Sequence, residues 1–158
     1  MEHTLVRDEL LNKIRYAERL CQRTARLYRR IQSATTFMTI VGGSAAASAL
    51  MAHTPAWLPV TGTLLLALFG AVAIAVRPAD KAAQNEMDVK RYGAIRTKAS
   101  SMTDEALSQA IDEATANNAA VEVEPLRDVA YNDVAREVGR PDSVVQLNLQ
   151  QRLIAALA

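Results

Sequence analysis

The chain has 158 residues, 50% of them hydrophobic, with 18 lysines and arginines against 17 aspartates and glutamates. This length allows one small domain, and a single cysteine excludes a disulfide framework within the chain. The charges are unevenly distributed, because no Asp, Glu, Lys or Arg occurs between Arg30 and Arg77. The sequence therefore consists of charged flanks around one long uncharged stretch.

Residues 1–31 have the pattern of a long amphipathic helix. Apolar residues recur mostly at helical spacing, at Leu10, Ile14, Ala17, Cys21, Leu27 and Ile31. Another face is basic and carries Arg15, Arg19, Arg23, Arg26 and Arg30. This arginine stripe has two interpretations: a surface that binds anionic lipid or a phosphorylated ligand, and a solvated face that only satisfies membrane orientation. Nothing in the sequence breaks the helix before residue 32, so we expect it to continue into the uncharged stretch.

The uncharged stretch predicts a transmembrane helical hairpin over residues 32–76. A bilayer core needs about 20 apolar residues per helix, so the stretch holds two spans, near 32–51 and 57–76, joined by a tight turn. Small residues dominate the middle of the first span, and such residues let helices approach closely in lipid. The residues predicted to pack helices or to form an oligomer are Gly42, Gly43, Ala46, Ala47, Ala67 and Ala71.

Hydroxyl side chains of the first span have two possible roles. Thr36, Ser44 and Ser48 lie roughly on one helix face, where they would line a polar path through an oligomer. The alternative is that they hydrogen-bond to their own helix or to a neighbouring one. The sequence leaves both roles open.

Lysines and arginines cluster on both sides of the uncharged stretch and are missing from the predicted turn. The positive-inside rule therefore places both termini in the cytoplasm of a multi-pass protein of the cell membrane. Aromatic and basic residues mark the membrane interfaces in this arrangement. They are Tyr28, Arg29, Arg30, Trp57 and Arg77.

Residues 77–158 are predicted to form a helical region on the cytoplasmic side. Pro78 indicates a kink or a new start, and a helix over 80–100 follows. The apolar side of that helix is predicted to comprise Ala83, Met87, Tyr92, Ile95 and Ala99. The chain beyond Met102 is acidic, and this tail either folds against the basic N-terminal helix or is repelled from anionic headgroups.

Further helix boundaries follow from capping residues in the acidic tail. One helix is expected to begin at Thr103 and to end near Asn117. Another opens at Pro125 and ends at Gly139. Ser143 and Gln146 have the spacing of a capping box, which predicts a last helix to about Ala156.

Sequence motifs for catalysis are absent. The chain contains no phosphate-binding glycine loop, no zinc-protease motif and no nucleophile elbow. Cysteine and histidine total only three residues, and His3 and His53 fall in different predicted compartments. We therefore predict no enzymatic activity, no catalytic or metal-binding residue, no cofactor and no nucleic-acid partner.

The layout resembles the SLATT domains, bacterial two-transmembrane effectors associated with nucleotide-second-messenger synthases and nucleotide-sensing domains. The resemblance covers nearly the whole chain and begins with a basic helix that ends in Leu27-Tyr28-Arg29-Arg30, followed by two close spans. The segment Ala82–Tyr92 is similar to the helix after the second span. The other matching segments are Ala130-Tyr131-Asn132-Asp133, Val138-Gly139-Arg140, Val145-Gln146-Leu147 and Gln150-Gln151-Arg152.

The resemblance implies a role in bacterial anti-phage defence. A cytoplasmic signal from a separate sensor or nucleotide synthase would drive homo-oligomerisation in the inner membrane and open a pore or disrupt the bilayer. No catalytic residue follows from the family. Two alternatives remain: a scaffold without a pore that recruits a cytoplasmic partner, and a holin-like hairpin, which the long C-terminal tail disfavours.

Overall fold

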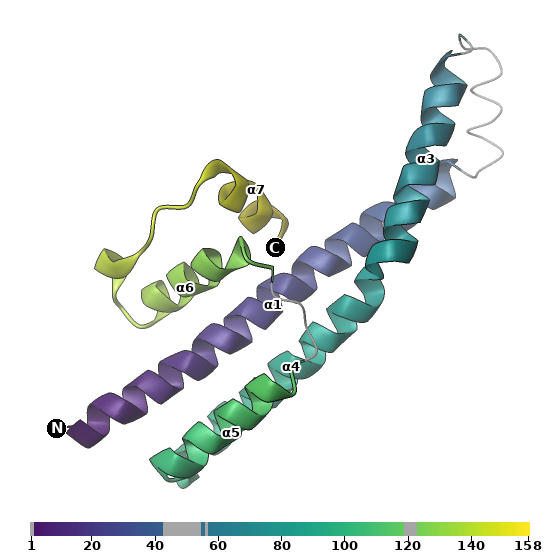
Figure 1. The fold of residues 1–158 in the computed structure, drawn as a ribbon. Coiled ribbons are helices and arrows are strands. Elements are labelled where there is room, and N and C mark those ends of the chain that lie inside the picture. Colours follow the sequence, from purple (N-terminus) through teal and green to yellow (C-terminus); the bar gives the residue numbers. More distant parts are fainter. Residues whose placement is uncertain (1, 43–54, 56, 119–122) are drawn as a thin grey trace. The chain divides into compact units, whose positions relative to one another are not determined.

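The computed structural model describes residues 2–42, 55, 57–118 and 123–158, in which all regular structure is helical (Figure 1). The helices are α1 (Glu2–Gly42), α3 (Trp57–Val76), α4 (Pro78–Lys98), α5 (Asp104–Ala116), α6 (Leu126–Glu137) and α7 (Leu149–Leu157), with 3-10 helices η1 (Ala99–Ser101) and η2 (Pro141–Ser143). The predicted all-α class is therefore confirmed for the described residues.

The chain forms two compact units. The bundle unit contains residues up to Leu27 together with Lys81–Ala158, and the apolar unit contains Tyr28–Asp80. Helix α1 contributes residues to both units, because it continues without a break for 41 residues. The predicted continuity of the basic helix into the uncharged stretch is thus confirmed as far as Gly42.

Apolar side chains of α1, α4 and α5 form the core of the bundle unit. Ile14 of α1 and Leu107 of α5 are completely buried there. The core cluster consists of Leu10, Ile14, Cys21, Tyr92, Ala99, Leu107, Ile111 and Ala114. Burial of these side chains from three helices supplies the main apolar stabilisation of the unit.

The buried face of α4 differs from the predicted one. Ala83 and Met87 are exposed, whereas Tyr92 and Ala99 are buried as expected. The face toward the unit's interior also includes Ala82, Asn85 and Asp88. Asn85 tolerates burial because its amide donates a hydrogen bond to the carbonyl of Lys81 at 2.8 Å. Apolarity alone therefore misplaces the packed face of this helix.

Capping residues set the ends of α5 and α6 as predicted. The Thr103 hydroxyl accepts a hydrogen bond from the Ala106 amide at 3.3 Å, and α5 ends at a cap formed by Asn117. Helix α6 follows Pro125 and stops before Gly139, which has φ +74°. The Arg140 amide then bonds the Ala135 carbonyl at 2.8 Å, the closure expected of a glycine stop.

The predicted capping box of Ser143 and Gln146 is wrong. Residues 144–148 are outside any helix, and the Ser143 hydroxyl donates to the Arg140 carbonyl instead. The box is formed five residues later by Asn148 and Gln151, whose side chains accept from each other's backbone amides at 2.8 and 2.9 Å. Helix α7 therefore begins at Leu149.

Asn132 explains this delay. Its buried side chain donates to the Val145 carbonyl and accepts from the Val145 amide, both at 2.8 Å. The amide group thereby pairs with Val145 as a neighbouring strand would, and both backbone groups of Val145 become unavailable for a helix. The Tyr-Asn segment of α6 thus holds the chain after η2 in an extended conformation.

Asn132→Asp tests this pairing. An aspartate cannot donate to the Val145 carbonyl and places a carboxylate oxygen against it, so we expect a loss of about 1–3 kcal/mol in unfolding free energy. Thermal unfolding of the detergent-solubilised full chain measures the change. Asn117→Asp is the matched control, because the Asn117 amide also donates to a carbonyl but is exposed. Equal shifts in melting temperature for the two variants would contradict the role of Asn132.

Candidate functional site

The apolar unit contains the membrane span that the structure supports. Helix α3, Trp57–Val76, coincides with the predicted second span. It exposes large apolar side chains around its surface, among them Leu64, Leu68 and Ile74. Within the described residues one helical stretch, Val60–Ser101, is long and apolar enough to cross a membrane, and its uncharged part ends at Val76.

Much of the first predicted span lies outside the described residues. Its described part, residues 32–42, forms the end of α1 and exposes Phe37, Ile40 and Val41. The first span, and with it the two-span hairpin, therefore stays a prediction. At the end of α3, Arg77 has a left-handed φ of 47° and Pro78 starts α4, as the predicted kink required.

The predicted packing residues divide into three groups. Gly42 lies against Leu66 of α3, so closely that a Cβ atom at residue 42 would overlap the Leu66 side chain. Ala67 and Ala71 are exposed on α3. Gly43, Ala46 and Ala47 lie outside the described residues. The structure thus provides one close contact of a small residue with a neighbouring helix.

Threonine hydroxyls of the apolar unit bond within their own helices. Thr35 and Thr39 donate to carbonyls one turn earlier, and Thr61 donates to the Trp57 carbonyl. Thr36, predicted to face a pore, is exposed and lies 3.2 Å from the Gln32 amide nitrogen, which donates to it. Ser44 and Ser48 lie outside the described residues. Back-bonding thus gives the hydroxyls of Thr35, Thr39 and Thr61 partners within their own helices.

The predicted interface residues have different environments. Trp57 is 65% exposed, and Arg29, Arg30 and Arg77 are also exposed. Tyr28, in contrast, is buried. An exposed indole at the beginning of α3 fits a position near lipid headgroups.

Two arginines of α1 bind α6 through a pair of ion pairs, here called the clamp. Arg23 contacts Asp133 side-on, with Nε–Oδ2 at 2.8 Å and Nη2–Oδ1 at 3.1 Å. Arg19 contacts Glu137 at 2.8 Å. The partners are spaced by four residues on each helix in opposite order, so one turn of α6 runs antiparallel to one turn of α1.

A further ion pair joins α1 to the start of α5. Arg7 contacts Asp104 at 2.7 Å and also donates to the carbonyls of Ala99 and Met102. Of the two outcomes expected for the acidic tail, folding against the basic helix is therefore the one observed. The arginine stripe is not uniformly solvated, because Arg19 and Arg23 form ion pairs with Glu137 and Asp133 of α6.

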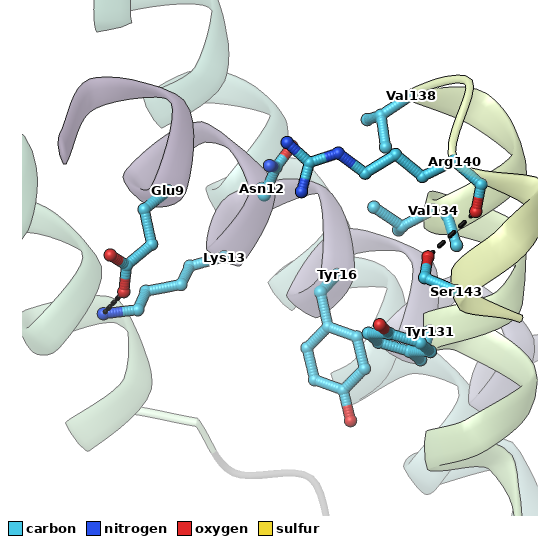
Figure 2. A pocket seen from close by; sticks show the side chains of 10 residues that line it. Glu9, Asn12, Lys13, Tyr16, Tyr131, Val134, Val138, Arg140 and Ser143 are labelled. Atoms are coloured by element: carbon cyan, nitrogen blue, oxygen red, sulfur yellow. Dashed lines mark hydrogen bonds and ion pairs between the residues drawn. The ribbon is translucent and has the colours of Figure 1, made fainter. Parts of the chain in front are cut away.

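A pocket of about 360 Å³ lies between the first half of α1 and the end of α6. Figure 2 shows Tyr16 of α1 beside Tyr131 of α6, with Arg140 reaching toward Asn12. Its lining is mainly apolar with a few charged side chains, and comprises Glu9, Asn12, Lys13, Tyr16, Tyr131, Val134, Ala135, Val138, Arg140 and Ser143. The volume falls within the range of small-molecule sites.

Asp88 is a buried carboxylate on α4. Its Oδ1 atom accepts from Arg91 at 2.8 Å, while Oδ2 has no hydrogen-bond partner within the described residues. Burial raises the pKa of Asp88, and the nearby Arg91 guanidinium opposes that change. Burial also raises the pKa of the Tyr92 hydroxyl, which lies 3.3 Å from the Thr115 hydroxyl.

Metal ligands do not gather in the described part of the chain, where no group of three or more His, Cys, Asp or Glu side chains could hold an ion.

Comparison with protein-family models, curated proteins and solved structures found no match. The resemblance to SLATT domains thus depends on the sequence segments alone. In the structure, residues of those segments make contacts that shape the C-terminal region. Asn132 pairs with Val145, and Gly139 ends α6. Gln151 caps α7 and donates a hydrogen bond to Asp128 at 2.6 Å.

Sequence reasoning did not find the pocket. One half of its lining had a detectable signal in the sequence, a set of residues on one face of α1 spaced by three and four positions. These residues are Glu9, Asn12, Lys13 and Tyr16. Their partners, Tyr131 and Arg140, are more than a hundred residues away along the chain. Only the packing of α6 on α1 brings the two sets together.

The clamp is expected to stabilise the bundle unit mainly through its more buried pair. The side chains of Arg23 and Asp133 are 23% and 16% exposed, against 35% and 40% for Arg19 and Glu137. A double-mutant cycle on thermal stability should give a coupling of about 1 kcal/mol or more for Arg23–Asp133, since its bonds are bidentate and charge-assisted. The Arg19–Glu137 cycle should give only about 0.2–1 kcal/mol. The reverse ranking would refute this assignment.

Asp88 should make stability depend on pH. Because its pKa is raised in the folded protein, the folded state binds the proton more tightly than the unfolded state. Its contribution is then largest below the ordinary pKa of 3.8 and is lost as pH rises through the raised value. Melting temperatures measured across this range should fall less with pH in Asp88→Asn than in the wild type. Asp112→Asn, at an exposed position of α5, is the control and should follow the wild type.

Proposed function

We propose that this protein is a membrane effector of the SLATT type. It oligomerises in the bacterial inner membrane and, on a cytoplasmic nucleotide-linked signal from a separate protein, forms a pore or disrupts the bilayer during anti-phage defence. Both termini are cytoplasmic in this proposal, and membrane lipid and further copies of the chain are its partners. The bundle unit receives the signal and the apolar unit acts on the membrane.

The observation that carries the proposal is the continuity of α1. One helix contains the arginines that bind α6 and also Gly42, which lies against α3. A change in how α6 packs on α1 therefore acts on the same continuous helix that contacts α3. Hydrogen bonds within a helix remain satisfied in both water and lipid, so the element can enter a membrane without a break.

The exposed surface of α3 supports the membrane part of the proposal. Leu64, Leu65 and Leu68 are at least half exposed, together with Val60 and Ile74. Contiguous apolar surface of this kind marks contact with lipid or with other chains. Arg29, Arg30 and Arg77, exposed at the ends of the uncharged stretch, suit the headgroup region on one side of the bilayer.

A scaffold without a pore is the second candidate, and one observation favours it. Helix α7 exposes Leu149, Leu153 and Leu157, spaced by four residues on one face. A partner protein recruited by the bundle unit would find an apolar surface there. In this case the membrane helices serve only as an anchor, and no change in membrane permeability accompanies function.

Substitutions at glycine test the pore proposal. Gly42→Ala should reduce depolarisation and growth arrest on inducible expression, because its Cβ atom would overlap Leu66. Adding Leu66→Ala should restore activity by making room. Gly70→Ala is the control, since a Cβ atom there meets nothing within 4 Å. A membrane-potential dye measures the effect in cells.

The outcomes separate the two candidates. If Gly42→Ala and Gly70→Ala are equally active, the close contact at Gly42 has no part in pore formation. If the wild type neither depolarises cells nor arrests growth under any triggering condition, including phage infection, the pore proposal is wrong and the scaffold is favoured. Western blots of the membrane fraction ensure that the variants are compared at equal abundance.

A further inference from the structure

The pocket between α1 and α6 combines aromatic and aliphatic walls. Tyr16 and Tyr131 face it from opposite helices, and Val134, Ala135 and Val138 form the apolar side (Figure 2). Tyr131 remains 43% exposed although it belongs to a helix whose other side is packed. Two tyrosines and three aliphatic side chains favour a flat ring, because aromatic faces stack in offset arrangements.

The charged residues that line the pocket leave one cation unmatched within the described part of the chain. Lys13 and Glu9 contact each other at 3.3 Å, so their charges largely cancel. Glu137, which lines a neighbouring pocket together with Asp8 and Arg140, is bound by Arg19, and no ion pair joins Arg140 to either carboxylate among the described contacts. Among the described contacts, the Arg140 guanidinium has no hydrogen bond or ion pair of its own. It therefore remains available for an anionic group of a ligand.

Arg140 is positioned by backbone structure on both sides. Its amide bonds the Ala135 carbonyl at 2.8 Å in the glycine stop of α6, and its carbonyl accepts from the Ser143 hydroxyl at 2.8 Å. The backbone of Arg140 is thus fixed, while its side chain extends toward Asn12 (Figure 2). Its planar guanidinium suits bidentate recognition of a carboxylate or phosphate.

We propose that this pocket binds a small planar aromatic anion, with the ring against Tyr16 and Tyr131 and the anionic group on Arg140. Such a ligand would contact α1 and α6 at once and would bind beside the clamp. It would therefore change the stability of the α1–α6 contact. That binding changes membrane activity rests on the proposed function, whereas the binding itself depends only on the pocket.

A fluorescent probe tests the binding. The detergent-solubilised full chain is titrated with 1-naphthyl phosphate, and fluorescence anisotropy of the naphthyl ring reports binding. Two matched probes separate the contributions: 1-naphthol has the ring without the dianion and is followed in the same way, and inorganic phosphate has the charge without the ring and is tested as a competitor. We expect saturable binding of 1-naphthyl phosphate in the millimolar range or tighter, and at least tenfold weaker binding of each matched probe.

Variants locate the site. Arg140→Gln should weaken binding of 1-naphthyl phosphate at least tenfold while leaving 1-naphthol unchanged, because it removes only the cation. Tyr131→Leu keeps an apolar side chain and should weaken both naphthyl probes. Arg136→Gln is the control, since Arg136 is an exposed arginine of α6 outside the pocket lining. Circular dichroism of each variant shows whether its helices are retained.

Several results would overturn the proposal. These are absence of saturable 1-naphthyl phosphate binding, equal affinity for 1-naphthol, and equal losses in Arg140→Gln and Arg136→Gln. Equal affinity for the uncharged ring would indicate a groove for an apolar peptide segment instead. Binding that is present without any effect on membrane potential would leave the pocket valid and count against the proposed function, so the two failures are distinguishable.

Discussion

The structure depends on one constraint, the continuity of α1 through two different environments. Up to Leu27 the helix packs α4 and α5 on its apolar face and α6 on an arginine-bearing face. From Ile31 onward it carries no charge and exposes large apolar side chains. A helix can serve in both settings because its backbone hydrogen bonds close within the segment.

Apolar burial and ion pairs contribute differently to the bundle unit. Burial of Ile14, Tyr92 and Leu107 stabilises the contact of α1 with α4 and α5. The clamp adds less free energy, because its ion pairs are partly exposed to water. It does, however, require matched spacing on both helices, so it selects one antiparallel register for α6.

In the C-terminal segment, hydrogen bonds rather than ion pairs select one arrangement of the chain. Asn132 pairs with Val145, the chain stays extended to Asn148, and α7 then starts from a capping box whose Gln151 also binds Asp128. Each of these hydrogen bonds positions the part of the chain that forms the next one. The segments that carry the resemblance to SLATT domains therefore have a structural explanation in this chain, since they determine how α6, the extended segment and α7 fit together. The aromatic pocket is a consequence of that arrangement, because Arg140 is placed by the glycine stop.

The sequence alone predicts the helical class, the unbroken basic helix, the boundaries of α3 and the ends of α5 and α6, because these depend on local periodicity, charge and capping. It misplaced the start of α7 and part of the buried face of α4. Asn132 outcompetes a local capping box by reaching thirteen residues along the chain, and burial of Asn85 and Asp88 has no apolar signal. The clamp and the pocket were decided only by tertiary structure, since their partners lie more than a hundred residues apart. Local rules cannot rank such pairings, because the free energy of a long-range contact exists only after the helices have packed.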